Sequence, residues 1–385
     1  MPMATEPGSA ARRRWLMAAA AVWLSRHSVG FAMPRHGAST ATTATAPPLL
    51  ATAWNDARGR HFIGLLAIAG QQVRIDASIE VPTRAHAIAV EPGGSVLAVA
   101  RRPGDWLLRW QPHSASARAA AQWQWADEDR CFTGHTLRSP DGHHLYTAET
   151  DLRSGAGRLV QRDVDSLAVM REWPTRGSDP HDLQWLPSGR LLVANGGIAT
   201  LPETGRAKRA LDRMDSSIIE IDTRHDEVGP SLRLADPRLS LRHLALHLTG
   251  QVGIALQAEH DDPADRARAP VLALYDPATG ALHSVPHAPL LQGYGGDVAA
   301  LPEGWVVSCP RADQLAFFAL DGSWQGQLPL DAACALAVAE DASQAWAVGA
   351  KAVVALGGTR AGPCGVAGLQ IDNHVVVWLQ RPAPG

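Results

Sequence analysis

Residues 86–100 read HAIAVEPGGSVLAVA, and this stretch decides the fold. A histidine opens an apolar run, a Pro-Gly-Gly turn follows, and a second apolar run completes the unit. Proline fixes φ and glycine tolerates a positive φ, so the pattern is typical of two antiparallel strands joined by a tight turn. The same unit returns as HTLRSPDGHHLYTAE at 135–149, HDLQWLPSGRLLVAN at 181–195, HLALHLTGQVGIALQ at 243–257, DVAALPEGWVVSC at 297–309 and CALAVAEDASQAWAV at 334–348.

The spacing of these units predicts a ring of repeated sheets. They begin roughly 50 residues apart, which is close to the period of propeller blades with four antiparallel strands. Residues 49–80 add a unit that lacks its first strand, and the C-terminal stretch 371–379, IDNHVVVWL, is free to complete it. Such a closure removes the open sheet edges of the ring. We therefore predict an all-β chain with a seven-bladed β-propeller over residues 49–380 and velcro closure by the C-terminal strand. A ring of six or eight blades and a two-domain β-sandwich are the alternatives.

The N-terminus predicts export. Arg12, Arg13 and Arg14 precede the apolar run 16–24, and export signals place a charged region before roughly 7–15 apolar residues. The consecutive arginines resemble a twin-arginine signal. We predict a twin-arginine-type signal peptide over 1–32, a flexible linker over 33–48 and a mature chain in the periplasm. The apolar run is shorter than the about 20 residues that cross a bilayer, so no transmembrane domain is expected in the mature chain.

Charge and cysteine content narrow the classes of partner and cofactor. The chain of 385 residues has a formal net charge of -3, which gives no basic surface for nucleic acid. We expect a monomer. No two of the four cysteines form a C-x-x-C pair, so no zinc knuckle or dithiol motif is predicted. A Cys334–Cys364 disulfide is compatible with the periplasm, but burial as small core residues is the preferred interpretation.

Several short segments carry a family resemblance when they are taken together. They are AWND at 53–56, ARRPG at 100–104, YTAETD at 146–151, DPHDL at 179–183, NGGI at 195–198, RHL at 242–244 and DNH at 372–374. This set resembles domain-of-unknown-function family 1513 over most of residues 50–380. The resemblance implies a secreted propeller akin to the YVTN type, frequent encoding near imelysin-type proteins of iron acquisition, and no established activity.

Four histidines open first strands in consecutive units: His86, His135, His181 and His243. The first strand of each propeller blade lines the central channel, so we expect these imidazoles near one another at the channel mouth. Neutral imidazole is the commonest metal ligand, and it suits iron, copper or zinc. However, the distance to the turn glycine alternates between eight and seven residues, and a slip of one residue points a strand side chain to the opposite face.

Other polar residues extend this candidate site. Asp297 occupies the matching first position in the next unit, and Arg242 precedes His243. Arg101, Glu149, Asp151 and Asn195 fall at or just past the ends of second strands. Carboxylates and arginines side by side suit a charged ligand or a protein partner, although ordinary surface ion pairs explain them equally well.

These observations support two hypotheses of different classes. The first is a periplasmic propeller that binds a partner protein or a small ligand at its channel mouth, with the accessory role in iron uptake that the resemblance implies. The alternative is a metal-binding protein or an enzyme in which the four histidines hold a transition metal ion. A lactonase-type propeller is a third hypothesis, but no residue set singles it out. No nucleophile elbow, P-loop or dinucleotide motif occurs in a supporting context.

Overall fold

The computed structural model describes residues 48–114, 121–201, 205–209, 211–287, 289–339, 344–356, 364–366 and 368–378. The predicted signal peptide over 1–32 and the predicted linker over 33–48, apart from Pro48, lie outside these residues. The described chain consists mainly of β-strands, so the predicted all-β class is confirmed. None of its helices has the length and apolar character needed to cross a membrane.

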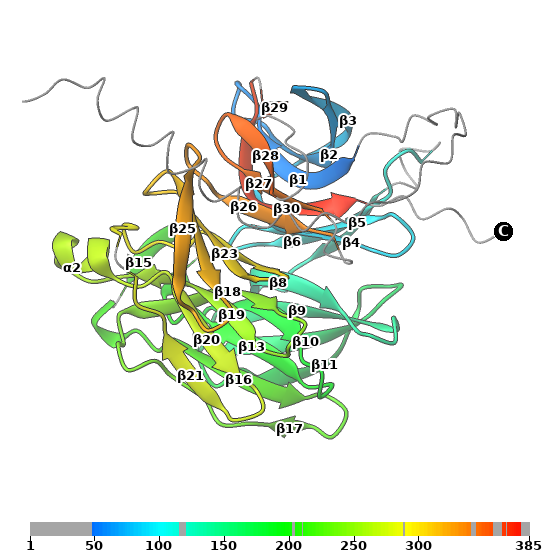
Figure 1. Ribbon diagram of the computed structural model, residues 1–385. Coiled ribbons are helices and arrows are strands. Elements are labelled where there is room, and N and C mark those ends of the chain that lie inside the picture. The colour runs from blue at the N-terminus through cyan, green and yellow to red at the C-terminus, as the bar shows by residue number, and fades with distance from the viewer. Residues whose placement is uncertain are drawn as a thin grey trace, which may run out of the picture. The chain divides into compact units, whose positions relative to one another are not determined.

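Four antiparallel sheets follow the simplest order, in which strands consecutive in the chain are neighbours in the sheet (Figure 1). Their strands are β4 (Ala85–Val90), β5 (Val96–Ala100), β6 (Trp106–Trp110) and β7 (Ala121–Trp125); β8 (Arg130–Arg138), β9 (His144–Asp151), β10 (Gly157–Asp163) and β11 (Val169–Pro174); β18 (Leu239–Leu246), β19 (Val252–Ala258), β20 (Leu272–Asp276) and β21 (Ala281–Ser284); and β22 (Asp297–Leu301), β23 (Gly304–Cys309), β24 (Gln314–Ala319) and β25 (Trp324–Pro329).

A further four-stranded sheet contains an insertion between its second and third strands. Its order is β12 (Pro180–Trp185), β13 (Leu191–Asn195), β16 (Ser217–Asp222) and β17 (Glu227–Val228). The insertion forms a separate hairpin of β14 (Ala199–Leu201) and β15 (Gly205–Arg209), followed by the 3-10 helix η2 (Leu211–Arg213). The short helix α2 (Pro263–Arg268) follows β19, and the Asp262 side chain caps its N-terminus by accepting from the Ala264 backbone N–H.

The two ends of the repeat region meet in one larger sheet. Its order is β26 (Ala335–Val338), β27 (Ala345–Val348), β28 (Ala352–Leu356), β29 (Cys364–Gly365), β3 (Gln72–Val81), β2 (His61–Ala69), β1 (Leu49–Asn55) and β30 (Gln370–Trp378). β30, from the C-terminal region, pairs antiparallel with β1, and Leu49 lies opposite Trp378. A single parallel pairing of Gly365 with Gln72 joins β29 to β3.

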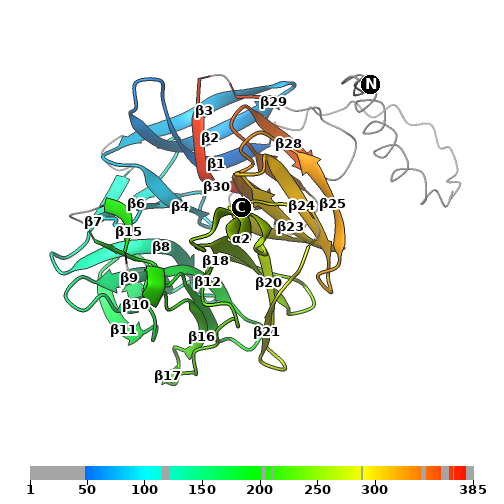
Figure 2. The ribbon, with the colours of Figure 1, turned by 90° about the vertical axis from the view of Figure 1, so that its left-hand side faces the viewer.

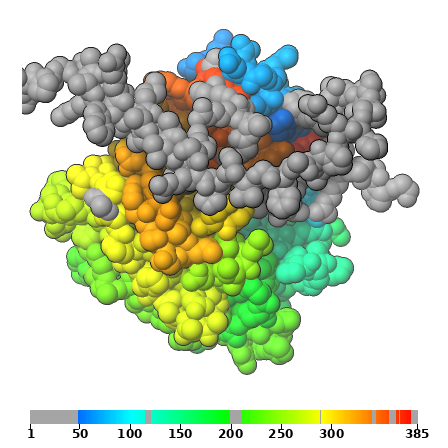
Figure 3. Space-filling view, in the orientation of Figure 1, coloured from blue at the N-terminus to red at the C-terminus, as the bar shows by residue number. Residues whose placement is uncertain are grey.

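The first strands of successive sheets contact one another in turn. β4 contacts β8, β8 contacts β12, and the series continues through β18, β22 and β26 to β30, which also contacts β4. Figure 2 shows the sheets standing side by side around the region where these strands meet. In the space-filling view, the residues coloured green through orange form a continuous surface (Figure 3). The first strands therefore bring together residues that are far apart in the sequence.

Burial differs between the second and the outermost strands of the four-stranded sheets. The second strands β5, β13, β19 and β23 are buried along their whole length, whereas β11 and β25 are largely exposed. Trp305 on β23 is 1% exposed and lies over Gly253 of β19, where an added Cβ would stand 2.5 Å from the indole. Side chains of this kind pack neighbouring sheets face to face, and each large one contributes about 2–3 kcal/mol on burial.

Candidate metal centre

Five histidines occupy interruptions of regular pairing on the first strands. Pairing with the neighbouring strand shifts register at His86 on β4, at His135 on β8, at His181 on β12 and at His243 on β18. The fifth is His374, which lies within a similar shift on β30. A bulge adds unpaired residues to one strand and redirects its side chains. These bulges allow the imidazoles to converge although the number of residues between each histidine and its turn glycine alternates between eight and seven.

The five imidazoles form one buried cluster. Nε2 of His181 lies 3.3 Å from Nε2 of His86 and 3.2 Å from Nε2 of His243. The ring of His135 is centred 5.2 Å from those of His86 and His243, and the ring of His374 is centred 4.4 Å from that of His135. One nitrogen from each of His86, His135, His181 and His243 lies within 4.8 Å of all the others. The structure therefore brings the four predicted histidines together.

Two aspartates lie beside the cluster. Oδ1 of Asp182 lies 3.2 Å from Nδ1 of His135, and Oδ2 of Asp297 lies 4.0 Å from Nδ1 of His374. Each carboxylate also accepts backbone N–H bonds from its own strand and from the next first strand, which fixes its position. Those donors are Leu183 and Leu244 for Asp182, and Val298 and Leu336 for Asp297. At His135, the carboxylate beside Nδ1 leaves Nε2 of the same ring free for a shared ligand, as in metal sites.

The cluster favours neutral imidazoles. Burial, first, and then the neighbouring cationic and imidazole groups hold the pKa values of His86, His181, His243 and His374 well below the ordinary value. Burial also lowers the pKa of His135, against the opposing effect of Asp182. Burial raises the pKa of Asp297 well above the usual range. Because a neutral imidazole has a free nitrogen lone pair, these rings are in the form that binds metal ions.

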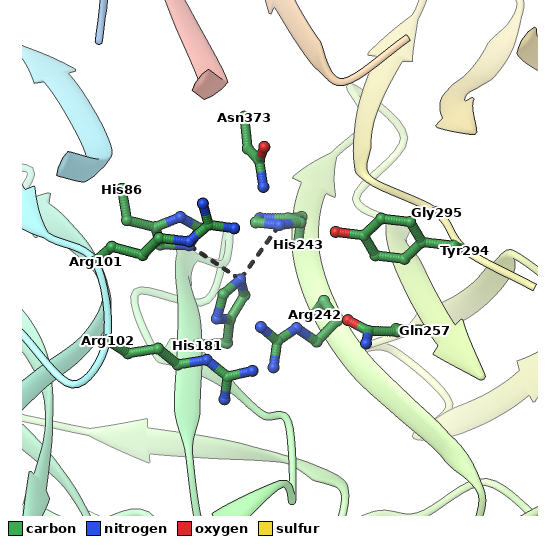
Figure 4. Close-up of a pocket in the computed structure, with 10 residues that line it drawn as sticks. All are labelled: His86, Arg101, Arg102, His181, Arg242, His243, Gln257, Tyr294, Gly295 and Asn373. Atoms are coloured by element: carbon green, nitrogen blue, oxygen red, sulfur yellow. Dashed lines mark hydrogen bonds between the residues drawn. The ribbon is translucent and has the colours of Figure 1, made fainter. Parts of the chain in front are cut away.

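A small polar cavity lies against three of the imidazoles (Figure 4). It offers about 20 Å³ to the centre of a water-sized sphere, enough for roughly one water or an ion. Its lining residues are His86, Arg101, Arg102, His181, Arg242, His243, Gln257, Tyr294, Gly295 and Asn373. A larger cavity of about 480 Å³ lies further along the same first strands, but its lining is mainly apolar. The polar cavity is the one adjacent to the candidate ligands.

The remaining predicted site residues divide into two groups. Arg101 and Arg242 line the polar cavity, whereas one carboxylate oxygen of Asp297 lies 4.0 Å from Nδ1 of His374. Glu149 is buried and accepts from the Arg162 guanidinium at 2.7 Å. Asp151 accepts backbone N–H bonds in the turn that follows β9, and Asn195 donates to the Thr175 carbonyl. None of these last three residues lines the cavity, and the contacts found for them are internal ones.

Three residues beside the site, His374, Asp182 and Asp179, were not predicted as site residues from the sequence. His374 belongs to the quoted DNH segment, and the prediction that its strand completes the first unit was the available signal. Asp182 directly follows His181 and carried no separate signal. Asp179 accepts from both Arg102 and Arg242 through the same oxygen and is 4% exposed. Only the fold reveals that pairing, because Arg102 follows β5, Asp179 precedes β12 and Arg242 lies on β18.

The four cysteines are free thiols. The thiol of Cys334 contacts the Val348 and Asp372 carbonyl oxygens, whereas that of Cys364 contacts the Gly70 carbonyl oxygen. The two sulfurs therefore have different partners. Cys131, Cys309 and Cys364 are buried, and burial raises the pKa of the Cys309 thiol to about 12.

Comparison with known families decides the relationship of the chain. The model of the family described as "Protein of unknown function (DUF1513)" matches residues 79–378. The chain belongs to this family. The matched region of this DUF1513 protein contains all five imidazoles and every residue that lines the polar cavity. No curated protein matches the chain.

Solved structures similar to this DUF1513 protein agree on the fold. A protein from Lactobacillus plantarum has a TM-score of 0.58 and 14% identity, with 86% of this chain and 99% of that chain covered. The periplasmic gluconolactonase of Pseudomonas aeruginosa has a TM-score of 0.51 and 14% identity, with 74% and 83% covered. A streptogramin B lyase has a TM-score of 0.50 and 11% identity, with 80% and 92% covered. Together they support a fold of the β-propeller type.

Proposed function

We propose that this protein binds one transition metal ion through Nε2 of His86, His181 and His243, with His135 as a fourth ligand. The single observation that carries the proposal is the spacing of 3.2 and 3.3 Å between these Nε2 atoms. Ligands bound tetrahedrally at ~2.0–2.1 Å from one ion lie ~3.3–3.4 Å apart. The imidazoles therefore already stand at the separation that a shared ion requires.

A purely structural role accounts less well for the cluster. Nε2 of His135 and of His374, and Nδ1 of His86, His181 and His243, are buried without a hydrogen-bond partner. Buried polar atoms in native proteins almost always have partners, because each unsatisfied atom costs about 1–3 kcal/mol. An ion held as proposed would supply a partner for Nε2 of His135, whereas Nδ1 of His86, His181 and His243 takes no part in the proposed coordination.

The donor set selects a class of ion. Imidazole nitrogen suits Fe(II), Ni(II), Cu(II) and Zn(II), whereas Mg²⁺ and Ca²⁺ require oxygen ligands. Iron is the ion that the resemblance to proteins encoded near imelysin-type iron-uptake genes favours. We propose a role in handling such an ion, either as an accessory to iron uptake or as a metal-dependent enzyme.

A substitution with a matched control tests the proposal. His181→Gln removes the nitrogen that contacts two neighbours, and His225→Gln changes an imidazole that is 69% exposed. In isothermal titrations of tag-free protein with Co(II), the wild type and His225→Gln should bind about one equivalent, and His181→Gln should bind at least about tenfold more weakly. An equal affinity of all three proteins would refute the shared site. Loss of folding in His181→Gln, seen by circular dichroism, would favour a structural role instead.

Three further features belong to this proposal. We propose that the sheets are seven blades and that β30 closes the ring, supported by the sequence of contacts among the first strands and by the pairing of β30 with β1. We propose export as a folded protein to the periplasm, supported by the arginines and apolar run of the N-terminus. A protein partner at the channel mouth remains the complementary hypothesis, and capture of a defined partner by the folded chain would test it.

A further inference from the structure

The polar cavity has an excess of positive charge. Its charged lining residues, among those described, are Arg101, Arg102 and Arg242, and none of its lining residues is a carboxylate. Arg102 and Arg242 are each 6% exposed, and both donate to the same oxygen of Asp179. The Asp179 carboxylate thus accepts hydrogen bonds from two buried guanidinium groups. This trio retains one net positive charge.

The third arginine of the cavity, Arg101, also has a carboxylate nearby. Asp372 is 1% exposed, pairs with Arg84, whose side chain is 37% exposed, and lies 3.8 Å from Arg101. A divalent ion on the neutral imidazoles would add two further positive charges beside the trio of Arg102, Arg242 and Asp179. Uncompensated buried charge costs several kcal/mol, so the trio and the ion together favour an anion.

We propose that the cavity binds the carboxylate group of a ligand, or another planar oxyanion of similar size, between the arginines and the metal ion. This inference rests on the proposed metal function and specifies the class of its second ligand. Guanidinium groups recognise planar oxyanions through paired N–H donors. Asn373, Gln257 and Tyr294 line the same cavity and offer neutral polar groups beside the arginines (Figure 4).

The small volume restricts the ligand. About 20 Å³ of space holds roughly one water or an ion, so it admits at most the end of a carboxylate group and excludes a sugar or a whole lactone ring. The carboxylate can be a free small anion or the end of a longer ligand that enters from the channel mouth.

Cobalt absorption provides a direct test, because Co(II) bands in the visible range respond to a change of ligand. Tag-free protein is loaded with one equivalent of Co(II) in a chloride-free, non-coordinating buffer and titrated with acetate or with hexanoate. We expect a saturable spectral change with acetate. A matching change with hexanoate would indicate that the carboxylate belongs to a longer ligand, and its absence would indicate a free small anion.

Variants assign the change to the cavity. Arg242→Gln and Arg101→Gln should retain Co(II) and weaken acetate binding by about tenfold or more. Arg153→Gln, whose side chain is 81% exposed, is the control and should bind acetate as the wild type does. Arg101 is the second variant because Arg242 is deeply buried and its replacement is the more disruptive of the two. Retained Co(II) with no response to acetate would overturn the anion site and leave the metal site intact. Failure to bind Co(II) at all would overturn both.

Discussion

Acidification of the metal-free protein should lower its free energy of unfolding, because the imidazoles are buried in the neutral form. Their pKa values are lowered in the folded state, chiefly by burial, whereas in the unfolded chain they return to about 6.5. Below pH 6.5 the unfolded chain therefore binds protons that the folded protein does not. The stability associated with these groups is fully present above that pH and is lost as the pH falls.

The expected loss is large. Each neutral imidazole destabilises the folded state by about 1.4 kcal/mol per pH unit below its unfolded pKa. Five of them give an upper limit of about 7 kcal/mol between pH 7.5 and pH 5.5, against a total stability of about 5–15 kcal/mol for a typical domain. The loss becomes smaller if one ring, such as the partly exposed His135, takes up a proton in the folded state.

Urea unfolding followed by tryptophan fluorescence measures this effect. The free energy of unfolding of metal-free protein is determined at pH 7.5, 6.5 and 5.5, with the double variant His181→Gln, His243→Gln beside the wild type. The double variant should lose about 3 kcal/mol less than the wild type over this range, whereas His225→Gln should behave as the wild type. A wild-type stability that changes by less than about 1 kcal/mol would refute the reasoning, because it would mean that the cluster is not buried and neutral.

Three more substitutions test the supports of the site. Asp182→Asn removes the anionic partner of one imidazole and should weaken Co(II) binding about 10–100-fold in isothermal titrations; unchanged affinity would contradict the orienting role. Asp179→Asn leaves two buried guanidinium groups without a charged partner and should lower the free energy of unfolding by about 3–5 kcal/mol in urea, so a loss below about 1 kcal/mol would argue against the buried trio. Gly134→Ala places a Cβ 1.8 Å from the His181 carbonyl oxygen and should destabilise the folded protein by about 1–3 kcal/mol in thermal melts. In the same experiment Gly93→Ala, with nothing within 4 Å of the added Cβ, should be nearly neutral.

The repeat could be predicted from the sequence because turn-forming residues separate the two apolar runs of several units. Gly94 and Gly142 adopt φ values of 81° and 77° in turns that the Pro-Gly-Gly and Pro-Asp-Gly patterns predict. The hairpins and the all-β class follow from such local signals. The pairing of β30 with β1 was expected for a different reason, since residues 49–80 lack a first strand of their own.

The geometry of the site was less accessible from the sequence. The four histidines were identified because they share a position in the repeat, but their spacing gave conflicting orientations. Bulges in the first strands turn the four imidazoles toward one another, and no residue pattern in these strands predicts the bulges. Glu149 lies within β9 and Asn195 is the last residue of β13. Their contacts are internal, and the pairing of Glu149 with Arg162 joins neighbouring strands in a way that position in the repeat does not reveal.

X-ray absorption at the metal edge tests the central claim most directly. Tag-free protein, purified without added metal and then loaded with one equivalent of Co(II), is measured at pH 7.5. We predict a first shell of about four nitrogen atoms at ~2.0–2.1 Å, with the outer-shell scattering that imidazole rings produce. A shell of oxygen atoms alone, or a metal that dialysis removes completely, would contradict the account.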